Sequence, residues 1–207
     1  MKKTFTLALM AFACAIANVV LADSSQRMDY DTLEILAESQ KAYEENGADE
    51  AIKVLTKFQN SDRGKAITPH DLAHVMYRRA QFAIEQKDLP HAIDLLKSTL
   101  EVQGDLEYLD KDQIRYQLAQ VYFGLEIWDE GLAALDDLEG RLLENWKIYF
   151  LKAQAYRKLG DEESARQEYL TASSIIVSQK EVMPPRLKQF GVHLLLEEGE
   201  EDVEDPM

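Results

Sequence analysis

Apolar residues recur at intervals of three and four along most of this chain, and polar residues fill the positions between them. That spacing places apolar side chains on one side of a helix, so it predicts amphipathic α-helices. The helical patterns come in pairs, and a short polar break separates the two members of each pair. Four such units align with one another, at residues 30–59, 69–102, 110–140 and 143–179. A single helical pattern follows at residues 184–196.

A small residue recurs at two places in every unit, once in each helical pattern. The two series are Ser39, Ala80, Ala119 and Ala153, and Ala51, Ala92, Gly131 and Ala165. Both series advance by 41, 39 and 34 residues. Two helices whose axes are about 8–10 Å apart need a methyl group or a hydrogen where they cross. The series therefore predicts pairs of antiparallel helices that repeat along the chain.

These units resemble the tetratricopeptide repeat (TPR), a helix–turn–helix unit of about 34 residues with small residues where its helices cross. The resemblance covers about residues 30–180, which is nearly all of the chain after residue 22. It implies an all-α, right-handed α-solenoid of about four helix pairs, with residues 184–196 as a capping helix. Two spacings are longer than the TPR unit, and we place the extra residues in the polar, turn-rich stretches 59–68 and 103–110. Thr68 and Pro69 are typical of an N-cap and a first helical position, which predicts a helix start there.

The resemblance also implies a partner-binding groove, because the first helix of each TPR unit lines the concave side of the solenoid. One column of this groove is an amide in every unit, and a second column, one turn earlier, is aromatic or aliphatic. The columns are Gln40, Gln81, Gln120 and Gln154, and Leu36, Tyr77, Tyr116 and Phe150. Amides can donate to and accept from a peptide backbone while rings supply rigid apolar contact, so we expect an extended or helical protein segment to bind here. The other interpretation is that the glutamines are simply solvated and the aromatic residues fill the space between units.

Signals for catalysis or metal binding are weak. His70 and His74 are four residues apart, as in metallopeptidase helices, with Asp71 where those enzymes have Glu. Capping explains His70 and Asp71 equally well, and His91 and His193 carry no matching motif for a third ligand. The Lys, Asn and Arg set with which some TPR proteins hold a peptide carboxylate is not reproduced, since Gln occupies the Asn column. The sequence has no phosphate-binding loop or nucleophile elbow, so we expect no enzymatic activity, no cofactor and no metal.

Composition and charge narrow the class of partner. The chain has 207 residues, with 38 Asp and Glu against 23 Lys and Arg, and a net charge of −15. That balance argues against a non-specific binder of nucleic acid or of an anionic membrane, because such surfaces need basic residues to displace counterions. One cysteine excludes an internal disulfide framework and a thiolate zinc cluster. Residues 197–207 are mostly acidic, and we interpret them as a disordered tail that maintains solubility, with capture of a basic partner as the alternative.

Residues 1–22 have the layout of a secretory signal peptide. A lysine-led start precedes an apolar stretch at residues 7–21, and Ala22 is followed by polar residues. The stretch is shorter than the roughly 20 residues of a membrane-spanning helix. We therefore expect cleavage after Ala22 and export to a bacterial periplasm, which leaves residues 23–196 as the TPR domain. An alternative is that Cys14 is a lipid-attachment site.

Together these features predict an exported, non-enzymatic adaptor that binds a protein or peptide segment in its concave groove, as part of a cell-envelope complex. The layout is similar to periplasmic TPR components of TonB-type energy-transduction or envelope-assembly systems. Two other functions stay open: a metal-dependent hydrolase that uses His70 and His74, and a lipid-anchored assembly factor attached through Cys14. The pattern identifies neither the partner nor an oligomeric state.

Overall fold

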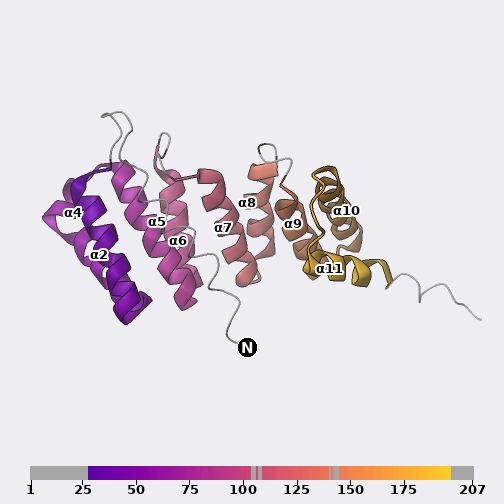
Figure 1. Cartoon of the computed structure of the whole chain (residues 1–207), viewed down its shortest axis with the longest axis horizontal. Coiled ribbons are helices and arrows are strands. Elements are labelled where there is room, and N and C mark those ends of the chain that lie inside the picture. Colours follow the sequence, from indigo (N-terminus) through magenta and orange to yellow (C-terminus); the bar gives the residue numbers. More distant parts are fainter. Residues whose placement is uncertain (1–27, 104–105, 107–108, 140, 142–144, 197–207) are drawn as a thin grey trace, which may run out of the picture.

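The computed structural model describes residues 28–103, 106, 109–139, 141 and 145–196, which form a row of paired helices (Figure 1). The pairs are α2 (Tyr30–Asn46) with α3 (Ala48–Asn60), α5 (Pro69–Gln86) with α6 (Leu89–Glu101), α7 (Lys111–Gly124) with α8 (Trp128–Glu139), and α9 (Trp146–Leu159) with α10 (Glu162–Ser178). A short helix, α4 (Asp62–Ala66), lies between the first two pairs, and α11 (Pro185–Leu196) follows the last. None of the helices in these ranges combines the length and the apolar content that crossing a membrane requires. The predicted signal peptide, Cys14 and the acidic tail lie outside the described residues.

The small residues lie where the helices cross, as their spacing predicts. Ser39 and all six alanines of the two series are fully buried. At Gly131 an added Cβ would lie 2.2 Å from a ring carbon of Phe123, so α7 and α8 can approach this closely only because no side chain is present. Other core residues join successive pairs: one cluster combines Ala80 of α5, Leu96 of α6 and Leu118 of α7. The core is therefore built between neighbours in the row, as in other solenoids.

Side-chain caps begin most of the helices. At α5 the structure confirms the predicted start: Thr68 Oγ1 accepts a hydrogen bond from the backbone N–H of Asp71 at 3.1 Å, and Pro69 is the first helical residue. The caps of α2, α6, α7, α9 and α10 are Asp29, Asp88, Asp110, Asn145 and Asp161. Each accepts from N–H groups that the first turn of a helix leaves without a backbone partner. Four of the acidic residues of the chain therefore serve as N-caps of its helices.

Residues 59–68 are more than the turn-rich connection that the sequence indicates, because α4 forms inside them. Ser61 caps this helix, with its Oγ 3.1 Å from the backbone nitrogen of Gly64. Arg63 then pairs with Asp31 at 2.5 Å and with Glu34 at 2.6 Å, both on α2. The extra residues between the first two units thus form a helix that contacts the first helix pair through ion pairs.

The C-terminal helix does not continue the row. In Figure 1, α11 runs across α9 and α10 instead of lining up beside them. Its anchors are Leu187 and Leu194, which are 0% and 2% exposed, and Phe190, which is half-buried. α10 ends at Ser178, and α11 begins at Pro185, since proline suits the first position of a helix.

Candidate functional site

Two of the four predicted amides meet at one cation. Arg78 of α5 donates from Nη1 to Oε1 of Gln81 at 2.8 Å, and its Nη2 donates to Oε1 of Gln40 on α2. Gln40 in turn donates from Nε2 to Glu44 at 2.7 Å. The side-chain amides of the first two units therefore lie side by side. We call the side of α2, α5, α7 and α9 that is predicted to carry the four glutamines the amide face.

Aromatic rings support the same cation. The guanidinium of Arg78 lies over the ring of Phe82, 4.6 Å from its centre, and Phe82 stacks on Tyr43 of α2 at 5.2 Å. The Tyr43 hydroxyl donates to the carboxylate of Glu85, and this hydrogen bond raises the pKa of Tyr43. Burial lowers the pKa of Arg78, although an arginine stays charged at any physiological pH. The joint between the first two units thus contains a half-buried positive charge held by amide oxygens and a ring face.

The apolar column is largely used in packing. Leu36 is half-buried in the first core cluster, and Tyr77, only 7% exposed, belongs to the core of α5, α6 and α7. Burial is the main cause that raises the pKa of Tyr77. Tyr116 is half-buried against the cluster between α7 and α9, and Phe150 contacts Phe190 of α11, with 5.5 Å between ring centres. Of the three aromatic positions, Tyr77 is buried, whereas Tyr116 and Phe150 keep part of their surface exposed.

The other two amides, Gln120 and Gln154, are exposed on α7 and α9. Within the part of the chain that the structure describes, no hydrogen bond joins either of them to the pair at Arg78. Gln40 and Gln81 thus bind the same arginine, and the column of four glutamines as a partner-binding groove stays a prediction. Periodicity identified the glutamines because they repeat. It gave no signal for the role of Arg78, which occurs in one unit only.

The His70 and His74 rings meet edge to face, with 4.9 Å between their centres. Asp71, which stands where a metallopeptidase has its base, is 2% exposed and already engaged. Its carboxylate accepts from Thr68 Oγ1 at 2.7 Å and from the backbone N–H of Asp29 at 3.2 Å. No group of three or more His, Cys, Asp or Glu side chains among the described residues could hold a metal ion. Thr68 and Asp71 therefore act together in the capping of α5.

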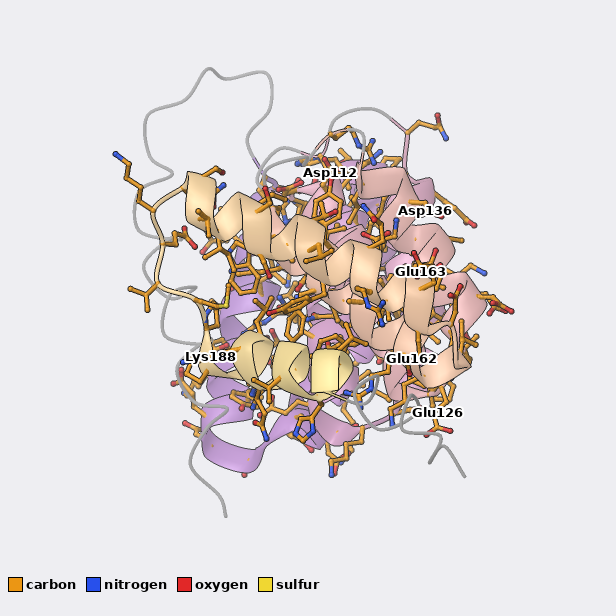
Figure 2. The ribbon with its side chains drawn as sticks, turned by 90° about the vertical axis from the view of Figure 1, so that its right-hand side faces the viewer. Asp112, Glu126, Asp136, Glu162, Glu163 and Lys188 are labelled. Carbon is orange, nitrogen blue, oxygen red and sulfur yellow. The ribbon has the colours of Figure 1, made fainter. Side chains whose placement is uncertain are left out.

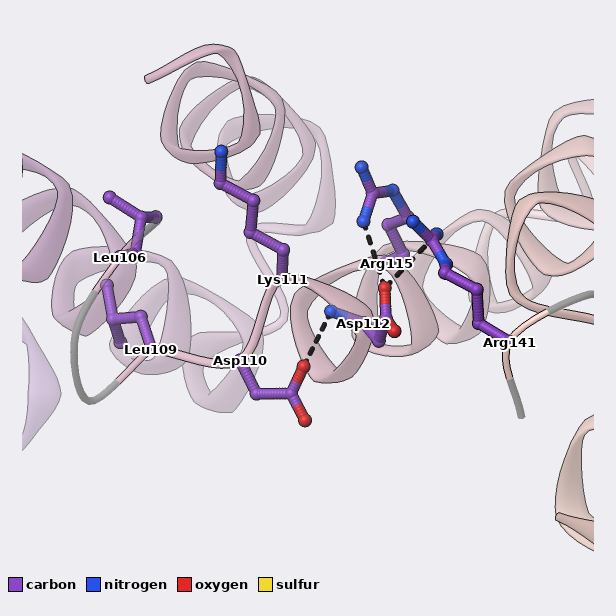
Figure 3. Close-up of a pocket in the computed structure, with 7 residues that line it drawn as sticks. All are labelled: Leu106, Leu109, Asp110, Lys111, Asp112, Arg115 and Arg141. Atoms are coloured by element: carbon purple, nitrogen blue, oxygen red, sulfur yellow. Dashed lines mark hydrogen bonds and ion pairs between the residues drawn. The ribbon is translucent and has the colours of Figure 1, made fainter. Parts of the chain in front are cut away.

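A surface pocket of about 310 Å³ lies at the start of α7 (Figure 3). Its lining residues are Leu106, Leu109, Asp110, Lys111, Asp112, Arg115 and Arg141. Arg115 Nη1 and Arg141 Nη2 each lie 3.1 Å from the same Oδ1 of Asp112. Asp110 caps α7, and Lys111 donates to the backbone carbonyl of Val102 at 2.8 Å. All five charged lining residues thus have partners in the structure, and with three cations against two anions the lining is slightly positive.

A second cation is buried inside the fourth unit. Lys152 of α9 is 4% exposed, and its Nζ lies 3.0 Å from Oδ1 of Asp136 on α8 and 3.1 Å from Oε1 of Glu168 on α10. The ammonium therefore links three helices of the third and fourth pairs. A lysine inside a helical pattern usually lies on a solvated side, so the sequence does not indicate this contact.

The fold is shared with several solved structures. The MamA fragment from residue 41 onward of Desulfovibrio magneticus RS-1 matches with a TM-score of 0.59 and 13% identity, over 85% of this chain and 99% of that chain. A chain described as a kinesin light chain of Podospora anserina, with nearly identical TPR-like repeats, matches with a TM-score of 0.62 and 15% identity, over 84% and 90% of the two chains. No protein-family model matches this sequence, and no curated protein does. The structural matches confirm the predicted fold class, a TPR-like all-α solenoid.

Proposed function

We propose that this protein is a non-enzymatic scaffold that binds an extended or helical segment of another protein along the amide face. The observation that carries the proposal is the meeting of Gln40 and Gln81 at Arg78, which brings hydrogen-bonding groups of successive units into one surface. A peptide backbone presents donors and acceptors at regular intervals, and amide side chains can satisfy both kinds. The TPR-like fold supports this reading, because repeat solenoids create extended surfaces for protein partners.

Gln120 and Gln154 provide the test of this proposal, because both are exposed and their replacement should leave the core intact. A photoreactive residue at position 120 should crosslink a protein partner in cells, which mass spectrometry then identifies. The matched control is the same residue at Gln167, which is exposed on α10, the second helix of its pair.

Once the partner is known, Gln120→Ala with Gln154→Ala should weaken its binding. The loss of two hydrogen bonds predicts about tenfold weaker binding, since each contributes about 0.5–1.5 kcal/mol. The melting temperature should stay unchanged, and Gln167→Ala should bind as the wild type does. Equal crosslinking from positions 120 and 167, or unchanged affinity in the double variant, contradicts the proposal.

We further propose that the scaffold is exported and works in the bacterial cell envelope, after removal of residues 1–22. The support is the signal-peptide layout of this segment. Mass spectrometry of the mature chain should find Asp23 as its first residue. An acylated Cys14 at the N-terminus would instead favour the lipid-anchored assembly factor.

A further inference from the structure

The C-terminal helix packs against α9 next to the amide face. Phe190 of α11 packs edge to face on Phe150, and the guanidinium of Arg157 lies 5.4 Å from the centre of the Phe190 ring. Phe150 and Arg157 are seven residues apart on α9, and Gln154 lies between them on the same side of that helix. Phe190 therefore reaches the stretch of α9 that carries the fourth predicted amide.

One side of α11 makes all of these contacts. Leu187 and Leu194 are almost completely buried, and Gly191 is buried as well. An added Cβ at Gly191 would lie 2.0 Å from the hydroxyl oxygen of Tyr169, so the helix backbone touches α10 directly at this point. With Phe190, the contacts follow the spacing of one face of a single helix. What α9 and α10 hold is thus a short amphipathic helix.

The held helix is basic, whereas the protein as a whole is acidic. Residues 185–194 contain Arg186 and Lys188 and no Asp or Glu, while the whole chain carries a net charge of −15. Figure 2 shows Lys188 on the opposite side of this end view from Asp136 and Glu163. The apolar stripe therefore fits the helix to this place, and the basic Arg186 and Lys188 lie on its exposed side.

We propose that the surface of α9 and α10 under α11, here called the α11 site, is a docking site for a basic amphipathic helix of a partner protein. α11 occupies the site until such a helix replaces it. The partner helix repeats the anchor spacing of α11, with an aromatic residue three positions after one leucine and four before another. Anchors at such spacing are how helices bind in grooves. The partner role rests on the proposed scaffold function, and docking itself does not.

The short connection at residues 179–184 sets the competition for this site. A tether of this length presents α11 at an effective concentration of about 1 mM. A helix that is free in solution at about 1 μM is therefore outnumbered by about a thousandfold. Binding from solution should be weak in the wild-type chain and strong once α11 is released.

Peptide binding to the full-length chain tests this inference. The probe is a fluorescein-labelled peptide of residues 183–194, and fluorescence anisotropy measures its dissociation constant. Phe190→Ala with Leu194→Ala removes two anchors from α11 but leaves every residue of α9 and α10 in place. This double variant should bind the peptide at least about tenfold more tightly than the wild type, because the tethered competitor is lost. Gln189→Ala, at an exposed position of α11, is the matched control and should behave as the wild type does.

Two altered peptides test the assigned chemistry on the double variant. A peptide with Phe190→Ala should bind at least about tenfold more weakly, since it lacks the aromatic anchor. A peptide with Arg186→Glu and Lys188→Glu should also bind more weakly at low salt. If the native peptide binds the wild type and the double variant equally, or binds neither, the docking site is refuted. Equal binding of the acidic peptide overturns the assignment to a basic helix.

A second variant serves if circular dichroism shows that the double variant does not fold. Gly191→Leu should push α11 away, because its Cβ would overlap the Tyr169 hydroxyl, and it should expose the same site. The two proposals can also fail separately. A missing crosslink from position 120 refutes the scaffold on the amide face whatever the peptide does. Failure of the peptide refutes the α11 site even where that crosslink forms.

Discussion

Replacement of Lys152 by methionine tests whether the buried ammonium joins the third and fourth helix pairs. The side chain of Lys152 is 6% exposed, and its two carboxylate partners differ sharply: Asp136 is 60% exposed and Glu168 only 15%. Methionine keeps most of the aliphatic stem and removes the charge. The variant therefore leaves the Glu168 carboxylate largely buried without this cation.

The exposures decide the size of the effect. An exposed ion pair contributes about 0–1 kcal/mol to the free energy of unfolding, so the contact of Lys152 with Asp136 should contribute no more than this. Removal of one partner from a buried pair costs about 3–5 kcal/mol. Because Glu168 keeps some contact with water, we expect Lys152→Met to lower the free energy of unfolding by about 2–3 kcal/mol. Adding Glu168→Leu removes this largely buried charge, so the double variant should recover most of the loss.

Urea unfolding followed by tryptophan fluorescence measures these free energies, and Trp146 reports from the same helix as Lys152. In double-mutant cycles, the coupling of Lys152 with Glu168 should exceed its coupling with Asp136 by about 1 kcal/mol or more. The reasoning is refuted if Lys152→Met costs no more than Asp136→Asn. It is equally refuted if Lys152→Met with Glu168→Leu is less stable than Lys152→Met alone.

Three further predictions concern the caps, charges and crossings of the row. Thr68→Ala should destabilise the protein by about 0.5–2 kcal/mol in thermal unfolding, because α5 loses its N-cap, whereas Thr68→Ser should cost much less. The hydrogen bond from Arg63 lowers the pKa of Asp31 below 3.8. The pair therefore stabilises the folded chain at neutral pH, and this stabilisation is lost as the pH falls through the lowered pKa. NMR titration should show the Asp31 pKa returning towards 3.8 in Arg63→Ala. Gly131→Leu should cost about 1–3 kcal/mol in urea unfolding through its clash with Phe123; full stability would mean that α7 and α8 can separate without penalty.

The periodic features of this fold could be predicted from the sequence because the physics behind them repeats. Every helix crossing needs a small residue, so Ala80, Ala119 and Ala153 reveal the crossings without any knowledge of the structure. The start of α5 was equally readable, since Thr68 and Pro69 act on their immediate neighbours. Features that depend on neighbouring residues, or that repeat from unit to unit, can therefore be recognised in the sequence.

Features that occur once left no such signal. α4 has five residues, which is too short to show a helical period, so residues 59–68 were interpreted as turns. The buried contact of Lys152 combines carboxylates from two other helices, and only the stacked structure brings them together. The meeting of two predicted amides at Arg78 depends in the same way on how one unit is placed against the next. The candidate site was therefore predicted as a column, and its polar connection was not.

The shared hydrogen bonds of Arg78 also bear on the mechanics of the row. Arg78 and Gln81 both belong to α5, so the bond to Gln40 is the one that crosses from the second helix pair to the first. The bond to Gln81 holds the guanidinium in place on its own helix. An apolar core that combines Ile35 of α2 with Val75 and Phe82 of α5 spans the same joint. Bending the row here would therefore have to disturb both a charged hydrogen bond and a packed core.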